Sequence, residues 1–317
     1  MGAVEIRDLH KNPRSNGLPV VLNLSAVVLA LFALAKGWPT DGWLSISFWV
    51  IWLSYFQHTW MTIFHEDVHY ALYKPKWRNV LNGTIVGTLL TVPFTVYRHV
   101  HIRHHNRMNH PEDWELWPYV DPTKSLTFRR IFLVFDVLLG LWVAPFIYAR
   151  IFFVKDSPIT DAAARRRIAI EYSVMLAFWA AIWGLVIYSG EWWLFAKMYL
   201  IPAWLSGVVQ TFRKFTEHLG LPLGTPMEGA RTVLPDDPLG KAVAYTSFHI
   251  TAHGVHHQYP QMPHENLEKA IGVERNEHPN APIFASHWRA FRDMATHLWY
   301  PGIGVNARSA TSPAANN

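Results

Sequence analysis

Four long apolar stretches, grouped in two pairs, dominate the pattern of hydrophobic and polar positions along the chain. They cover residues 18–35, 43–64, 168–188 and 192–212. Each is long enough for a helix that crosses a bilayer, which needs about 20 residues. Short polar turns at 36–42 and 189–191 join the members of each pair. The pattern therefore predicts four transmembrane helices in two hairpins.

Two further apolar stretches, residues 80–96 and 131–154, are ambiguous. The first is short and is interrupted by two glycines and Pro93, and the second contains Asp136 and Pro145. From hydropathy alone, the second stretch could be a fifth span.

The distribution of charge predicts the orientation. Of the 28 Lys and Arg residues, only Lys36 and Lys197 lie in or near the two short turns. By the positive-inside rule, both termini and the long middle loop are cytoplasmic. We expect no cleavable signal peptide, because residues 1–17 are polar. The sequence thus predicts a multi-pass protein, which we expect in a bacterial inner membrane.

The composition indicates that a large part of the chain is polar and lies outside the bilayer. Half of the residues are hydrophobic, yet the mean hydropathy is only +0.06, too low for a chain that lies mostly in the bilayer. The absence of Cys excludes disulfides, thiolate ligands and iron–sulfur clusters. The 18 His are an unusual surplus. Nucleic-acid binding is not expected, because the basic residues flank membrane segments.

The histidines are concentrated in three clusters: HEDVH at 65–69, HIRHH at 101–105 and HGVHH at 253–257. On a helix, positions i, i+3 and i+4 share one face, so each cluster can direct its imidazoles at one point. Imidazole is a common ligand of transition metals. By chance, two HxxHH patterns are expected only at the ~10⁻³ level. The clusters therefore predict a metal site.

A shared site requires all three clusters to lie on one side of the membrane. Neither 80–96 nor 131–154 can then be a single span, and we predict that both form interfacial or membrane-dipping helices. Eight histidines exceed the four ligands that zinc usually takes. They favour two metal ions of higher coordination number, and iron is the natural candidate because it can change oxidation state with O₂.

The three clusters resemble the histidine boxes of the membrane-bound fatty acid desaturase superfamily, which also contains hydroxylases and carotenoid oxygenases. The likeness continues in HHNRMNHPED at 104–113, in RTV at 231–233 before the third box, and in RKFTEH at 213–218. It extends over roughly residues 20–300.

This resemblance implies an all-α membrane protein with a four-helix stem and a cytoplasmic helical cap that holds two Fe²⁺ ions. It adds His218 to the ligands, which are then His65, His69, His101, His104, His105, His218, His253, His256 and His257. We expect one membrane-bound domain over residues 1–317. It would comprise a polar segment at 1–17, spans and middle cap at 18–212, C-terminal cap at 213–302 and a disordered tail at 303–317.

Four carboxylates close to these ligands are candidates to accept the second N–H of a metal-bound histidine. They are Glu66, Asp67, Asp113 and Glu217. A solvent-facing charge is the alternative for each of them.

The expected activity is that of an oxidoreductase: O₂-dependent introduction of a double bond into a fatty acyl chain. No fused cytochrome b5 segment is visible, so electrons would come from a separate ferredoxin, rubredoxin or cytochrome. Hydroxylation or ketolation of a carotenoid, alkane or other lipid is the alternative within the superfamily.

Two other classes of protein remain as alternatives. Residues 65–69 also fit HExxH, the signature of a zinc protease, which would leave both HxxHH clusters unexplained. A transporter or metal-handling protein would be expected to show internal repeats or broken mid-membrane helices, and the two hairpins share no evident pattern.

Overall fold

The computed structural model describes residues 5–10 and 17–307, and their regular secondary structure is helical apart from one two-stranded sheet. The predicted all-α class is therefore confirmed. The chain divides into two compact units. Among the described residues, unit 1 comprises 5–10, 100–135 and 212–307, and unit 2 comprises 17–99 and 136–211.

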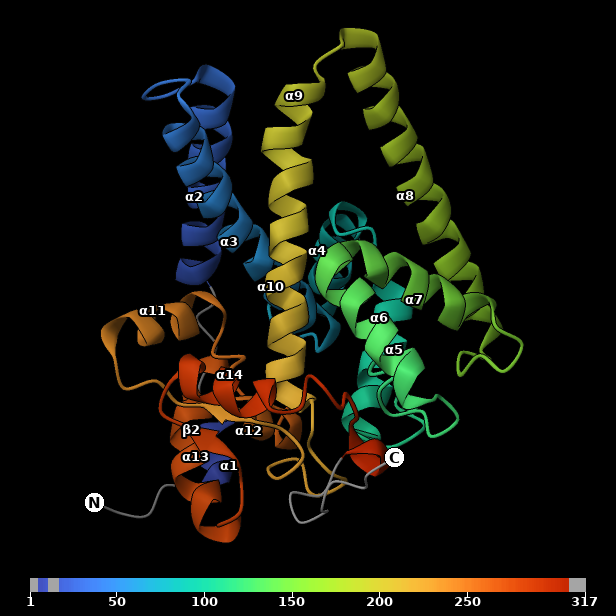
Figure 1. Cartoon of the computed structure of the whole chain (residues 1–317), viewed down its shortest axis with the longest axis vertical. Helices are drawn as coiled ribbons and strands as arrows, with labels where there is room; N and C mark the ends of the chain where they lie inside the picture. The colour runs from blue at the N-terminus through green and yellow to red at the C-terminus, as the bar shows by residue number, and fades with distance from the viewer. Residues whose placement is uncertain (1–4, 11–16, 308–317) are drawn as a thin grey trace. The chain divides into compact units, whose positions relative to one another are not determined.

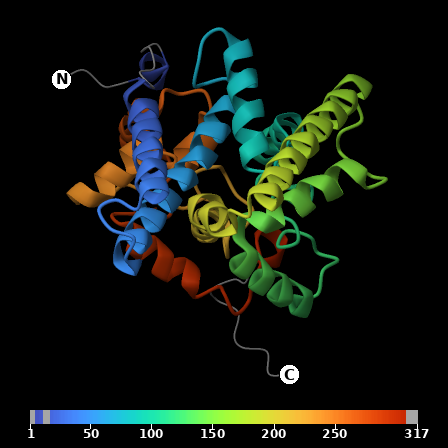
Figure 2. The ribbon, with the colours of Figure 1, turned by 90° about the horizontal axis from the view of Figure 1, so that it is seen from above.

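Unit 2 contains both predicted hairpins, except for residues 212–218 at the end of the second, which belong to unit 1. Helices α2 (Gly17–Lys36) and α3 (Trp43–Val68) lie side by side (Figures 1 and 2). Buried Ala30, Leu34 and Leu53 pack between them. The second hairpin consists of α8 (Ala162–Ser189), α9 (Trp192–Phe195), a π-helical turn η2 (Ala196–Leu200) and α10 (Ile201–His218). Helix α8 ends at Gly190, whose φ of 72° closes the last turn.

Three helical segments are long and apolar enough to cross a membrane: α2, α8 and the continuous stretch Trp192–His218. Helix α3, predicted as the second span, has 26 residues and is long enough. It is less apolar than these three, because serines, tryptophans and the pair Gln57–His58 interrupt its hydrophobic residues. The structure thus supports an integral membrane protein with three such segments, or four if a bent pair of helices is included.

That bent pair occupies the ambiguous stretch 80–96. Helices α4 (Lys76–Leu89) and α5 (Phe94–Asn106) meet at an angle of 103°. Stretch 131–154 is also broken. It divides among α6 (Leu126–Leu139), the short turn η1 (Gly140–Trp142) and α7 (Val143–Phe153). Helices α6 and α7 have 14 and 11 residues, too few to cross a bilayer. The prediction that 131–154 is not a straight fifth span is therefore confirmed.

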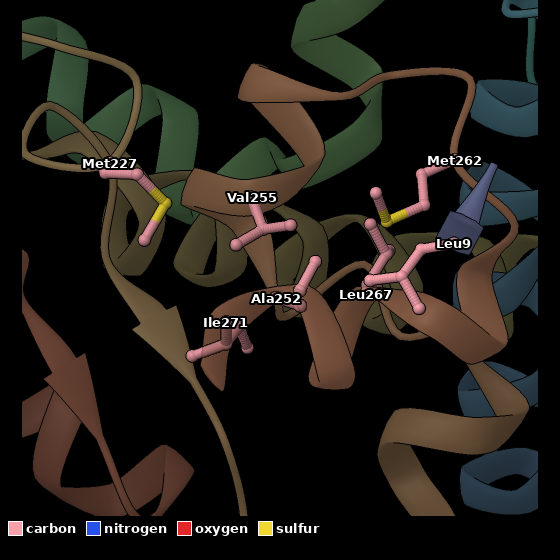
Figure 3. Close-up of a cluster of buried hydrophobic side chains, with 8 residues drawn as sticks. Leu9, Met227, Ala252, Val255, Met262, Leu267 and Ile271 are labelled. Atoms are coloured by element: carbon pink, nitrogen blue, oxygen red, sulfur yellow. The ribbon is translucent and has the colours of Figure 1, made fainter. Parts of the chain in front are cut away.

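Unit 1 has its own apolar core, shown in Figure 3. Helices α12 (His253–Gln258) and α13 (His264–Glu277) contribute Val255, Leu267 and Ile271, and Met227 closes one side. The short α1 (Ile6–Leu9) adds Leu9, which is only 4% exposed. Part of the segment predicted simply as polar therefore belongs to this core.

The rest of unit 1 surrounds this core. Strand β1 (Thr232–Val233) pairs in parallel with β2 (Ile283–Phe284). Helices α11 (Pro238–Thr246) and α14 (His287–Ala295) and the turn η3 (Gly304–Asn306) complete the described residues.

The predicted tail at 303–317 begins too early. The Ile303 amide donates to the carbonyl of Tyr119 at 3.1 Å, and the Gly304 amide donates to that of Leu221 at 2.9 Å. Ile303 is 1% exposed. Its apolar side chain and these two hydrogen bonds hold the segment against unit 1. Residues 308–317 lie outside the described part of the chain.

Candidate metal centre

The second and third histidine clusters lie on two helices of different length. His101, His104 and His105 occupy the C-terminal part of α5, and His253, His256 and His257 are three of the six residues of the short helix α12. Both helices are labelled in Figure 1. Helix α12 is fixed because Val255, on its opposite side, is fully buried in the core of unit 1. His218 is the last residue of α10.

One group of four histidines comes together in unit 1. Its members are His104, His218, His253 and His257, and one ring nitrogen of each lies within 4.8 Å of those of the others. The Nε2 atoms of His218 and His257 lie 2.9 and 3.1 Å from Nε2 of His253. All four side chains are buried.

A second group is formed in unit 1 by His101, His105 and His256, whose potential ligand nitrogens also lie within 4.8 Å of one another. The Nε2 atoms of His101 and His105 are 3.1 Å apart. In unit 2, His65 lies in the last turn of α3 and His69 is the residue that caps this helix, and their ring centroids are 4.8 Å apart. Both are buried.

The group of four fits a metal cation. Burial, together with neighbouring positive charge, holds the pKa values of His253 and His257 well below the usual range. These imidazoles are therefore neutral, and each has one nitrogen lone pair. Three Nε2 atoms separated by about 3 Å cannot all be satisfied by sharing protons. A transition-metal ion that prefers imidazole, such as iron, would accept these lone pairs.

Two carboxylates orient histidines of these groups. His104 Nδ1 donates to Asp113 Oδ2 at 2.7 Å, and His101 Nδ1 donates to Glu115 Oε2 at 2.9 Å. Burial lowers the pKa of His104, but the carboxylates of Asp113, Glu115 and Glu217 together outweigh burial and raise it to about 9. Burial raises the pKa of Glu115, but His101, His104 and Lys214 together outweigh burial and lower it. Both carboxylates thus favour a positive charge, or a bound cation, at the imidazole.

The other predicted carboxylates are placed differently. Glu217 Oε2 lies 3.6 Å from His253 Nε2, and Glu66 Oε1 lies 3.6 Å from His65 Nδ1.

Asp67 Oδ2 accepts a hydrogen bond from Asn82 Nδ2 at 2.6 Å, and its role as an orienting carboxylate stays a prediction. Burial raises the pKa of Asp67 to about 8. Sequence reasoning missed Glu115. The available signal was its place two residues after Asp113 in the same acidic motif, PEDWE.

The membrane-length helices and the buried histidine groups are consistent with one class of protein, an integral membrane protein with a histidine-ligated metal centre. Comparison with known families makes this class specific. Residues 41–284 match the fatty acid desaturase family, and the chain belongs to that family. It is therefore a member of a class of oxidoreductases. This family membership favours the desaturase interpretation of residues 65–69 over a zinc protease.

Three relatives are each similar in sequence to this protein over most of its chain. A sn-1 acyl-lipid omega-3 desaturase (ferredoxin) of Nostoc sp. is 24% identical over 85% of this chain and 81% of its own length. The sphingolipid delta(4)-desaturase of Mus musculus is 24% identical over 92% of this chain and 84% of its own. A Delta(12) acyl-lipid conjugase (11E,13E-forming) of Momordica charantia is 24% identical over 73% of this chain, and the match covers only 65% of that enzyme.

Proposed function

We propose that this protein is a membrane-bound, O₂-dependent desaturase that introduces a double bond into the fatty acyl chain of a lipid. The observation that carries the proposal is the convergence of four buried histidines from three separate helices, next to a second group of three. The names of the relatives, which include acyl-lipid and sphingolipid desaturases, support a lipid substrate.

We assign one iron to His104, His218, His253 and His257, the group whose nitrogens lie within 4.8 Å. The second iron would be held by His101, His105 and His256 of unit 1. His65 and His69 remain proposed iron ligands from the sequence. With O₂, two electrons and two protons, such a pair would supply the oxidising power to remove one hydrogen from each of two adjacent methylene groups and to release two waters.

The residues of the chain prepare this chemistry by orientation and by exclusion of water. Asp113 and Glu115 each accept a histidine N–H, which fixes the ring and the nitrogen that remains for the metal. His104 is 3% exposed and Asp113 is fully buried. A buried, preorganised site limits side reactions with solvent.

We further propose that the active site and both termini are cytoplasmic, because the basic residues avoid the two hairpin turns. Electrons would come from a separate ferredoxin, rubredoxin or cytochrome. The name of the Nostoc relative includes ferredoxin as its donor.

Expression in a host with a compatible reductase, followed by profiling of lipids and carotenoids, tests the proposal. Wild type should produce a new unsaturated acyl chain, and His104→Ala should not. The purified wild type should contain two irons per chain, whereas one zinc would favour a protease. A hydroxylated or ketolated product would favour the alternative activity, and a product that persists in His104→Ala would contradict the assignment of the metal site.

A further inference from the structure

The break between α4 and α5 leaves two helix ends that need hydrogen-bond partners. At a helix end, the last four carbonyls or the first four amides have no partner within the helix. An N-cap side chain normally accepts from one of these amides. The residues directly before α5 are Val92 and Pro93, and neither has a side-chain acceptor. The amide end of α5 must therefore be satisfied by another part of the chain.

Glu171 on α8 provides this partner. The Thr95 amide donates to Glu171 Oε2 at 2.7 Å, and the Thr95 hydroxyl donates to Glu171 Oε1 at 2.6 Å. Glu171 is 7% exposed, so both bonds form in a largely water-free environment. A carboxylate at the N-terminus of a helix is also stabilised by the helix dipole.

The carbonyl end of α4 is closed by the same hairpin. Trp179 Nε1, also on α8, donates to the carbonyl of Thr88 at 2.9 Å. The hydroxyl of Tyr199, in η2, donates to the carbonyl of Leu89 at 2.6 Å. The two rings lie 4.7 Å apart. Side chains of the second hairpin thus hold the break from both sides, and α4, α5 and α8 can be followed in Figure 1.

We propose that Glu171 is a positioning residue for the second histidine cluster. Helix α5 is continuous over 13 residues. The anchor at Thr95 therefore fixes the orientation of this helix, and with it the positions of His101, His104 and His105 in its last turns. This inference rests on the proposed function only in treating these histidines as metal ligands. It also explains why an ionisable residue occurs within a predicted span, where such residues usually serve a function.

The first test is hydrogen exchange of the full-length protein in detergent micelles or nanodiscs. Charge-assisted hydrogen bonds are among the stronger ones. Glu171→Ala should therefore accelerate exchange of the amides of residues 94–99 by about tenfold or more. Glu171→Gln, which retains one acceptor oxygen, should have a smaller effect. The matched control is Glu191→Gln, at the exposed turn of the same hairpin, which should leave exchange of 94–99 unchanged.

The second test measures whether the contact between Glu171 and Thr95 affects metal binding by the second histidine cluster. Glu171→Ala and Thr95→Val should each lower the iron affinity of the purified protein, and Thr95→Ser, which keeps the hydroxyl, should restore it. The effects of Glu171→Ala and Thr95→Val should be non-additive, because both variants remove the hydrogen bond from the Thr95 hydroxyl to Glu171.

The outcomes separate this inference from the proposed function. Wild-type exchange of 94–99 in Glu171→Ala would overturn it, as would additive effects of the two substitutions. Faster exchange with unchanged iron affinity would also overturn it and would leave the proposed desaturase intact. A wild type that binds no iron would instead contradict the proposed function, while the exchange experiment would still decide whether Glu171 anchors α5.

Discussion

The imidazoles of His101 and His104 each have one ring nitrogen bonded to a carboxylate, at 2.9 and 2.7 Å. The acidic motif after the second cluster predicted Asp113 as such a partner, but not Glu115. The difference lies in the loop that follows α5. Asn109 adopts a φ of 61°, and the course of a loop with such a residue has no periodicity from which side-chain directions can be predicted.

Replacement of either carboxylate should weaken metal binding. We expect Asp113→Asn and Glu115→Gln each to lower iron affinity by about 10- to 100-fold, because the ring orientation is lost. Titration of the metal-free protein with Fe²⁺ measures this directly. Glu112→Gln is the matched control, since this exposed carboxylate pairs with Arg103. An equal loss in the control would show that the motif acts only through its total charge.

A second prediction concerns the stability of unit 1. Arg231 is 1% exposed; its Nε donates to Asp293 at 2.7 Å and its Nη1 donates to the carbonyl of Leu219 at 2.7 Å. Arg231→Ala should lower the free energy of unfolding by about 1–3 kcal/mol, because the buried carbonyl of Leu219 loses its donor. Arg103→Ala, which removes an exposed pair, should cost less than about 1 kcal/mol. Thermal unfolding in one detergent compares the two variants, and similar losses would refute the difference.

At the scale of the helices, residues 131–154 do not form one span because the chain breaks at Gly140, between α6 and α7. Gly140 has a φ of 53°, and a Cβ at this position would lie 2.6 Å from backbone atoms of Gly207 and Val208 in α10. The need for glycine thus comes from a close approach of two backbones. The sequence predicted that this stretch is not a single span, since the histidine clusters must share one side of the membrane. It could not locate the break, because the contact with α10 is not encoded in local periodicity.

This close approach gives a prediction with an internal control. Gly140→Ala should destabilise the protein by about 1–3 kcal/mol, because the new methyl group meets backbone that cannot move aside. Gly184→Ala, on α8, should be nearly neutral or stabilising, since a Cβ there has nothing within 4 Å and alanine favours helix. Chemical denaturation in mixed micelles checks both, and a neutral Gly140→Ala would contradict the close packing.

Over the whole molecule, the proposed ligands are divided between two compact units. All of them belong to unit 1 except His65 and His69, which end α3 in unit 2. The sequence predicted that the three clusters serve one site, from their rarity and from the topology that they require. The division into two units could not be predicted, because unit 1 combines segments that are far apart in the chain.

The orientation of the molecule can be tested with single cysteines, since the chain contains none. Asp41→Cys and Glu191→Cys, in the two hairpin turns, should react with a membrane-impermeant maleimide added to intact spheroplasts. Glu277→Cys, at the end of α13, should react only after permeabilisation. All three wild-type positions are exposed. Labelling of Glu277→Cys in intact spheroplasts would overturn the proposed cytoplasmic location of the site.

The discontinuity of unit 1 also has a consequence for biosynthesis. The three membrane-length segments end by His218, whereas His253, His256 and His257 follow later in the chain. The contact of Ile303 with Tyr119, which ties down the end of the described chain, forms later still. A ribosome therefore completes every apolar segment before it has made the last histidines. The last proposed ligands are therefore made only after the membrane-length segments, and we expect iron to bind after these segments have left the ribosome.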